Sequence, residues 1–323
     1  MKAAIYRSYG PPEVLNIEDI EPPALQEEHE GRVLIQVHYA SVNPFDYLHR
    51  KGYFPIRLVN GLFAPKEQIQ RLGIDVAGTI AAIGKNVTRF KVGDPIFGNC
   101  VGSHAEYVRA RENAICMLPN SITFKEAAAI PTAALTALQA LRDVAKIEKN
   151  QKVLINGASG GVGHFAVQIA RFYEADVTAV CSTTNLKWVK DLGANTMIDY
   201  TKEDFTRNGE KYDIILDVAA THTYFKCKDS LTRSGVYITE NPLKPVYRPF
   251  QILFSSITGD KRGKSHLSLP NDKDMAFLRE LIEHGQLRPM IEKVYPLDRI
   301  VDAHRHVENG HTQGKVVVEI QKG

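Results

Sequence analysis

The spacing of hydrophobic positions divides the chain into a β-rich first part and a second part in which strands and helices alternate. Up to about residue 122, short apolar runs rich in β-branched residues are separated by frequent Gly and Pro. This pattern is typical of a small β-barrel or sandwich. The runs expected to form strands are 33–39, 78–84, 105–108 and 114–119, with a tight turn and another strand at 93–98.

Helical spacing begins after the β-rich part, over residues 124–144, which are rich in Ala and Leu. Ser121 or Thr123 can cap the start of this segment. Pro131 interrupts it, so two helices are expected to meet there.

The end of the chain is predicted to add two helices and a strand. The helices cover 272–284 and 297–309, each followed by a glycine that can end it, and the strand covers 315–320. Between 241 and 270 a stretch rich in Pro, Lys and Arg leaves the boundaries open.

The strongest local signal is residues 152–164, KVLINGASGGVGH, where an apolar strand enters a glycine-rich turn and helical spacing follows. Glycines in the turn let a backbone approach closely, and the unpaired N–H groups of a helix N-terminus come next. This predicts a pyrophosphate site formed by Ala158, Ser159, Gly160, Gly161 and Val162. Ala158 stands where the usual Gly-x-Gly-x-x-Gly fingerprint has its first glycine, and a plain tight turn would give the same letters.

The context of the turn favours a nucleotide-binding unit. Further strands are expected at 176–181, 197–198, 212–218 and 235–239, with helical segments between them. Strands that alternate with helices indicate an α/β fold with a doubly wound parallel sheet of the Rossmann type.

Composition narrows the class of protein. The length of 323 residues suggests two domains. The net charge of +3 without a basic run argues against nucleic acid as the main partner. No uninterrupted apolar run approaches the roughly 18 residues of a membrane span, and no signal peptide is visible. The four cysteines lie far apart without a Cys-x-x-Cys, which favours reduced thiols in an intracellular protein.

Several motifs, spread almost end to end, are similar to those of the medium-chain dehydrogenase/reductase superfamily, in its zinc-free quinone oxidoreductase-like branch. Besides the glycine turn they are 41–47, 73–78, 90–94, 133–137, 192–200 and 314–317. The resemblance implies a GroES-like catalytic domain formed by 1–122 and 268–323, with a Rossmann dinucleotide-binding domain, 123–267, inserted between the two parts. It also implies a homodimer.

The metal ligands of the zinc-dependent members are replaced in this chain. Those relatives use a Cys three residues before an Asp, and a Gly-His-Glu. Here Asn43 stands three residues before Asp46, and Ile74 and Asp75 replace the His and the Glu. Because amide and alkyl groups cannot substitute for thiolate and imidazole on zinc, no metal is expected.

Without a Lewis acid the acceptor must already be electrophilic. Hydride from C4 of a dihydronicotinamide adds readily to a quinone or to the β-carbon of an α,β-unsaturated carbonyl, whereas an unactivated ketone needs a metal or a proton donor. The sequence therefore favours direct hydride transfer to quinones or enones.

The end of the second Rossmann strand indicates the cofactor. An Asp or Glu about 20 residues after the first glycine holds the 2′-hydroxyl of NAD, but this chain has Ser182, Thr183, Asn185 and Lys187 there, without a carboxylate. These groups suit a 2′-phosphate and favour NADP(H), and the resemblance adds Tyr200 as a phosphate contact. The basic residue that relatives carry within 182–185 is absent, so Lys187 either replaces it or is a solvated helix lysine.

The resemblance also supplies the residues near the reacting groups. It implies that Asn43 and Tyr47 border the nicotinamide ribose and the substrate, that Thr136 touches the nicotinamide side, and that Ala219 approaches the cofactor. Asn43 could instead be a turn residue before Pro44, and Tyr47 could line an apolar pocket rather than donate a proton.

Three functions remain open at this level. The first is a cytoplasmic NADPH-dependent quinone or enone reductase. The second is an NAD(P)-dependent alcohol dehydrogenase or carbonyl reductase, and the third is a non-catalytic NADPH-binding regulatory protein. Turnover of quinones, alkenals and simple alcohols separates them.

Overall fold

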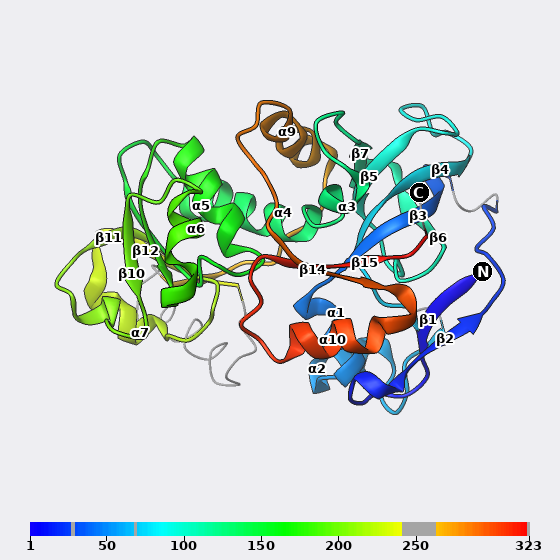
Figure 1. Ribbon diagram of the computed structural model, residues 1–323, viewed down its shortest axis with the longest axis horizontal. Coiled ribbons are helices and arrows are strands. Elements are labelled where there is room, and N and C mark those ends of the chain that lie inside the picture. Colours follow the sequence, from blue (N-terminus) through cyan, green and yellow to red (C-terminus); the bar gives the residue numbers. More distant parts are fainter. Residues whose placement is uncertain (27–29, 68–69, 241–262, 322–323) are drawn as a thin grey trace. The chain divides into compact units, whose positions relative to one another are not determined.

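The computed structural model describes residues 1–26, 30–67, 70–240 and 263–321 (Figure 1). The chain forms two compact units. The first unit comprises Met1–Thr132, Pro270–Gly285 and Pro289–Gly323, and the second comprises Ala133–Leu269 and Gln286–Arg288. The first unit thus reaches beyond the expected boundary at 122, because α3 (Phe124–Ala127) packs against β3 (Arg32–Val42) and β4 (Asp75–Ile83).

The first unit is built on a seven-stranded sheet in the order β14-β15-β3-β4-β5-β7, with β6 also paired to β3, and on a separate β1-β2 pair. Only β14 and β15 run parallel among the strands that pair in this sheet. The remaining strands are β1 (Lys2–Tyr6), β2 (Leu15–Asp19), β5 (Pro95–Asn99), β6 (Tyr107–Arg111), β7 (Ile115–Met117), β14 (Ile291–Pro296) and β15 (Lys315–Glu319).

The helices of the first unit lie around this sheet. They are α1 (Pro44–Lys51), α2 (Phe54–Asn60), α9 (Asp272–Glu283) and α10 (Ile300–Glu308), in addition to α3. Alternation along β3 turns Val33, Ile35 and Val37 into the core, where they meet apolar residues of β4, β6 and β15. Helices α1 and α10 lie side by side (Figure 1).

The second unit contains a six-stranded parallel sheet in the order β10-β9-β8-β11-β12-β13. Numbered along this unit, that order is the 3-2-1-4-5-6 of a doubly wound dinucleotide-binding sheet, so the predicted α/β fold is confirmed. Its strands are β8 (Lys152–Asn156), β9 (Asp176–Cys181), β10 (Thr196–Asp199), β11 (Tyr212–Asp217), β12 (Leu231–Thr239) and β13 (Gly263–Ser265). The helices are α5 (Gly163–Phe172), α6 (Leu186–Lys190) and α7 (Tyr224–Cys227).

The predicted break at Pro131 is confirmed. Helix α3 ends at Ala127, and α4 (Pro131–Gln139) begins at the proline and continues into a π-helical segment, Ala140–Ala145. A proline is tolerated in the first turn, where its missing N–H has no helical partner.

Most of the open stretch 241–270 lies outside the described residues, which show strand β13 near its end. Within the described ranges, no helix combines the length and apolarity needed to cross a membrane.

Candidate functional site

The glycine-rich turn lies at the carboxyl end of β8, the central strand where the winding order reverses. Gly157 takes a left-handed conformation with φ of 87°. The N–H groups of Gly157 and Ala158 donate to the carbonyl of Val180 at 3.1 and 3.0 Å, and the N–H of Gly160 donates back to Gly157 O at 3.0 Å. Helix α5 then begins at Gly163.

Two glycines of this turn have different roles. A Cβ on Gly163 would lie 2.1 Å from Gly157 O, so this position must be glycine for the helix to start against the strand. A Cβ on Gly160 would meet only Gly157 O, at 3.3 Å. Gly160 therefore has space beside it, as expected where a pyrophosphate approaches the backbone.

Ala219 meets the turn from the neighbouring strand β11. A Cβ on Gly157 would lie 2.9 Å from both the N and the Cβ of Ala219, and Ala219 donates its own N–H to Asn156 O at 3.1 Å. The carboxyl ends of β8 and β11 thus bring together Ala219 and the predicted residues 158–162. Ligands of open parallel sheets bind at this position.

Sequence analysis did not identify the buried Asp217 beneath this edge. Its Oδ1 accepts from Asn156 Nδ2 at 2.7 Å, and its Oδ2 accepts from the Tyr237 hydroxyl at 2.9 Å and from the N–H of His222 at 3.1 Å. These bonds join β8, β11 and β12 below the turn. No local pattern predicts them, because Asn156 and Tyr237 lie on two other strands and His222 lies in the loop after β11.

The segment after β9 carries Ser182, Thr183, Asn185 and Lys187, which are predicted to meet a 2′-phosphate. Asn185 is buried, with its Nδ2 donating to Ser182 Oγ at 2.9 Å and its Oδ1 accepting from Trp188 Nε1 at 2.8 Å. These bonds hold its amide within the segment. Lys187 and Tyr200 are exposed.

Thr183 carries a charge neighbour that the sequence reasoning missed. Its hydroxyl donates to Asp199 Oδ2 at 2.5 Å. This bond, with those from Thr201, lowers the pKa of Asp199 to about 2, so the group is a carboxylate at neutral pH. The negative charge lies beside one of the predicted phosphate contacts.

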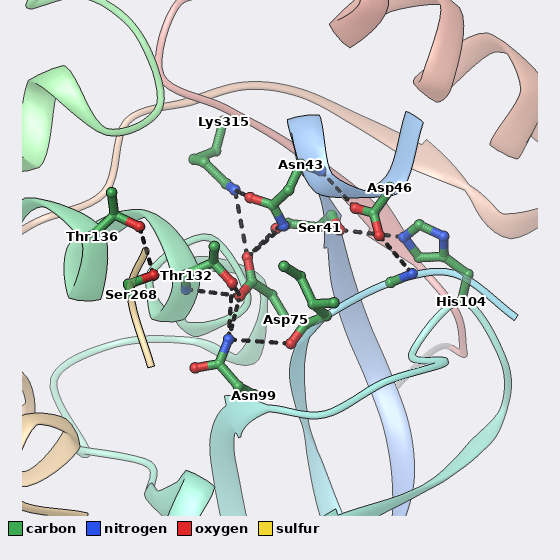
Figure 2. A network of polar contacts seen from close by, with 12 residues as sticks. Ser41, Asn43, Asp46, Asp75, Asn99, His104, Thr132, Thr136, Ser268 and Lys315 are labelled. Carbon is green, nitrogen blue, oxygen red and sulfur yellow. Dashed lines mark hydrogen bonds and ion pairs between the residues drawn. The ribbon is translucent and has the colours of Figure 1, made fainter. Parts of the chain in front are cut away.

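In the first unit, four neighbouring strands place polar side chains in one row (Figure 2). Strand β15 begins at Lys315. The next residue, Val316, pairs with Val42 at the end of β3. Ser41 near the end of β3 pairs with Asp75 of β4, and Asp75 pairs with Asn99 of β5. Asn43 follows directly after β3 and caps helix α1.

Asp75 is the centre of this row and is fully buried. Its Oδ2 accepts from the Ser41 hydroxyl at 2.6 Å and from Asn43 Nδ2 at 2.9 Å. Its Oδ1 accepts from the N–H and the hydroxyl of Thr132 at 2.8 and 2.6 Å, and from Asn99 Nδ2 at 3.1 Å. The Asp75 carboxylate therefore links strands β3, β4 and β5 with one another and with the start of α4.

Lys315 provides the positive charge of the row. The residue is 4% exposed, and its Nζ donates to Asn43 Oδ1 at 2.5 Å and lies 3.4 Å from Asp75 Oδ2. Burial lowers the pKa of Lys315, while Asp75 and Asp46 oppose this shift. This contact could not be predicted from the sequence, since the two residues that it joins are 272 positions apart.

These residues do not fit a catalytic zinc ion. Asn43 and Ile74 stand at two of the three ligand positions, and the third, Asp75, is already bound by several donors. The ammonium of Lys315, which has no lone pair to offer, lies against both Asn43 and Asp75 and would repel a dication. Among the described residues no group of three His, Cys, Asp or Glu could hold a metal.

Asp46 supports the row from the first turn of α1. Its Oδ2 accepts from the N–H of Asn43 at 2.7 Å, and its Oδ1 accepts from the N–H of Gly73 at 2.8 Å. Burial raises the pKa of Asp46 to about 7, against these two hydrogen bonds. His104, whose ring contacts the carbonyl of Ser41 at 3.2 Å, has its pKa lowered to about 4 by burial.

The raised pKa of Asp46 predicts that the wild type and Asp46→Asn differ in unfolding free energy by an amount that depends on pH. Between the ordinary carboxyl pKa of 3.8 and the folded value of about 7, the folded protein holds a proton that the unfolded chain has released. The stabilisation from this proton is complete at low pH and is lost as the pH rises through 7. The variant lacks this titration and loses an acceptor at every pH. Its deficit in unfolding free energy relative to the wild type should therefore shrink by about 3 kcal/mol between pH 5 and pH 8.

Urea unfolding of both proteins across this pH range measures the difference. Titration of the histidines is common to the two proteins and cancels. A deficit that stays constant or grows with pH would contradict the raised pKa.

The other predicted residues are placed as follows. Tyr47 on α1 is buried, which raises the pKa of its phenol and makes its hydroxyl a weaker acid. Thr136 on α4 shares a hydrogen bond of 2.9 Å with the hydroxyl of Ser268 in the same unit.

The chain matches two family models. Residues 192–318 match the family described as zinc-binding dehydrogenase, and residues 29–140 match the alcohol dehydrogenase GroES-like domain. The second match confirms the GroES-like part of the predicted fold.

Relatives that match over most of this chain indicate its branch of the family. A chloroplastic quinone-oxidoreductase homolog of Spinacia oleracea is 31% identical over 310 residues, which cover 92% of each chain. A chloroplastic NADPH-dependent alkenal/one oxidoreductase of Arabidopsis thaliana is 29% identical over 98% of this chain and 79% of its own. The structure of the quinone oxidoreductase from Coxiella burnetii matches with a TM-score of 0.86 and 30% identity over 99% of both chains. The chain therefore belongs to the medium-chain dehydrogenase/reductase superfamily, in its quinone oxidoreductase-like branch.

Proposed function

We propose that this protein is an NADPH-dependent reductase that transfers hydride directly to quinones or α,β-unsaturated carbonyls without a metal. The observation that carries the proposal is the Lys315 ammonium against Asn43 and Asp75, where zinc-dependent relatives hold their ion. These residues offer no Lewis acid, so the acceptor must be electrophilic by itself. Relatives named for quinone and alkenal/one reduction support the same substrate class.

The residues of the second unit fit a dinucleotide. Backbone N–H groups of residues 158–162 and the start of α5 would bind the pyrophosphate, and Gly160 has the open side that this requires. Ala219 would border the cofactor at the same sheet edge. The bound cofactor supplies a hydride from C4 of its dihydronicotinamide ring.

The residues of the first unit would act on the reacting groups. Asn43 would hydrogen-bond the nicotinamide ribose or the substrate oxygen, and Tyr47 would limit access of water. Thr136, which belongs to the second unit, is proposed to touch the nicotinamide side. An enolate or hydroquinone product can take its proton from water, so no protein acid is required.

The proposal is tested by NADPH oxidation with 1,2- and 1,4-quinones and with short alkenals. Turnover of either class supports it. Oxidation of simple alcohols with NAD⁺ or NADP⁺ in the absence of quinone or alkenal turnover would instead indicate an alcohol dehydrogenase. Tight NADPH binding without any turnover would indicate a regulatory protein.

The preference for NADPH is proposed to depend on Lys187, with Ser182, Thr183, Asn185 and Tyr200 around the 2′-phosphate. Lys187→Ala should raise the KM for NADPH about fivefold and leave the KM for NADH unchanged, because roughly 1 kcal/mol is typical of an exposed charge pair. Initial rates with both cofactors measure this. Lys190→Ala, an exposed lysine of the same helix, is the matched control.

If Lys187→Ala changes the KM for NADPH and the KM for NADH equally, Lys187 does not contact the 2′-phosphate. In that case the carboxylate of Asp199 beside Thr183 would be expected to hold NADPH preference low.

We also propose that the protein works as a cytoplasmic homodimer. The four cysteines lie far apart in the sequence without a Cys-x-x-Cys, which suits a reducing compartment, and dimers are the expectation from the family. Sedimentation equilibrium tests the oligomeric state, and a monomer at micromolar concentration would refute it.

A further inference from the structure

The amide of Asn43 is fixed at both ends by groups of opposite charge. Its oxygen accepts from the Lys315 ammonium at 2.5 Å, and its Nδ2 donates to the Asp75 carboxylate at 2.9 Å (Figure 2). A second contact of Nδ2, to Ser41 Oγ, is longer, at 3.4 Å. An ammonium can only donate and a carboxylate can only accept, so the reversed amide would oppose donor to donor and acceptor to acceptor.

This orientation decides what Asn43 can offer to a ligand. With Nδ2 turned to Asp75, the amide oxygen keeps one lone pair beyond the one that Lys315 occupies. A hydroxyl that approaches Asn43 Oδ1 therefore meets an acceptor in one fixed place. In the reversed amide it would meet an N–H donor in that place.

We propose that Lys315 is a positioning residue, whose ammonium locks the Asn43 amide so that its oxygen receives a hydroxyl of the nicotinamide ribose. This inference rests on the proposed function and extends it. Lys315 thereby has two tasks that a divalent cation performs in zinc-dependent relatives, balancing the buried carboxylate and fixing the adjacent side chain. Correct placement of the nicotinamide ring affects the rate of hydride transfer more than it affects the affinity of the protein for the dinucleotide.

The competing explanation is that Lys315 merely balances the charge of Asp75. Lys315→Met alone cannot separate the two, because it leaves a buried carboxylate without its counter-ion and damages the fold. The double variant Asp75→Asn with Lys315→Met removes both charges. Its new amide at position 75 can keep accepting from Thr132 and Asn99, while its NH₂ group turns towards Asn43.

The double variant should therefore fold with Asn43 reversed. Once Lys315 is gone, Asn43 Oδ1 is free to turn and accept from the new NH₂ group. We expect its urea midpoint to recover most of the loss seen in Lys315→Met. With a quinone acceptor, its kcat should stay at least tenfold below the wild type, with the KM for NADPH changed less than threefold.

Recovery of both stability and kcat in the double variant would overturn the proposal, since it would show that charge balance is the whole role of Lys315. An equal loss in kcat and in NADPH affinity would also overturn it. Lys293→Met, which removes an exposed lysine from the adjacent strand β14, is the control. It should change neither the urea midpoint nor kcat.

A crystal structure of the double variant provides a test that is independent of turnover. Hydrogen-bond partners of Asn43 show whether its amide has reversed, and an unreversed amide overturns the locking role of Lys315. If the wild type reduces no quinone or alkenal, the proposed function fails on its own evidence, and this structural result still decides whether Lys315 sets the amide.

Discussion

Replacing Asp75 by alanine is expected to lower the free energy of unfolding by about 3–5 kcal/mol, the usual effect of removing one partner of a buried ion pair. The carboxylate is fully buried and accepts hydrogen bonds from Ser41, Asn43, Asn99 and Thr132. Its loss removes one acceptor from each of these donors and leaves the ammonium of Lys315 buried beside a neutral side chain. Each unsatisfied buried donor adds a desolvation cost.

Chemical denaturation of purified Asp75→Ala and of Asp19→Ala measures this effect. Asp19 is an exposed aspartate on β2 of the same unit, and its replacement should change stability by less than about 0.5 kcal/mol. A loss at Asp75 of under about 1 kcal/mol would mean that the row of polar residues contributes little to the first unit.

The second large effect is expected at Gly163. A methyl group there would lie 2.1 Å from the carbonyl oxygen of Gly157 and 2.8 Å from the Cα of Ala158, both backbone atoms of the turn. The start of α5 would have to move away from β8. We expect Gly163→Ala to destabilise the protein by about 2–3 kcal/mol, even though alanine favours helix formation.

Gly160→Ala is the matched substitution in the same turn. Its methyl group meets only Gly157 O at 3.3 Å, so the fold should be retained. If the pyrophosphate lies against this glycine, as proposed, the added methyl group should weaken NADPH binding about tenfold with little change in thermal stability. Thermal melting with and without NADPH separates the two variants, and equal destabilisation by both would contradict the assigned roles.

Much of the second unit followed from local sequence. Strand, turn and helix succeed one another over 152–172, and β8 is a short, mostly apolar run that is buried from Val153 to Asn156, as strands of a parallel sheet usually are. Such a run can be recognised from neighbouring residues alone. The doubly wound fold and the place of residues 158–162 at its sheet edge could therefore be predicted.

The side-chain partners could not be predicted in the same way. Asn185 is held by hydrogen bonds with Ser182 and Trp188, which local spacing does not reveal. Helix α1 was also missed, although Asn43 caps it, Pro44 opens it and Asp46 returns a hydrogen bond to Asn43. An Asn-Pro-x-Asp sequence supports a cap and a turn equally well until the helix packs.

The sequence by itself determined the class of protein, the alternation of strands and helices in the second unit, and the replacement of the zinc ligands by Asn43 and Ile74. Only the tertiary structure decided that Lys315 contacts two of the residues that replace the zinc ligands. Pairing of β15 with β3, and of β3 with β4, brings Lys315 to Asn43 and Asp75. Strand register between distant segments depends on the burial of whole sheet faces, so no single stretch of sequence encodes this contact.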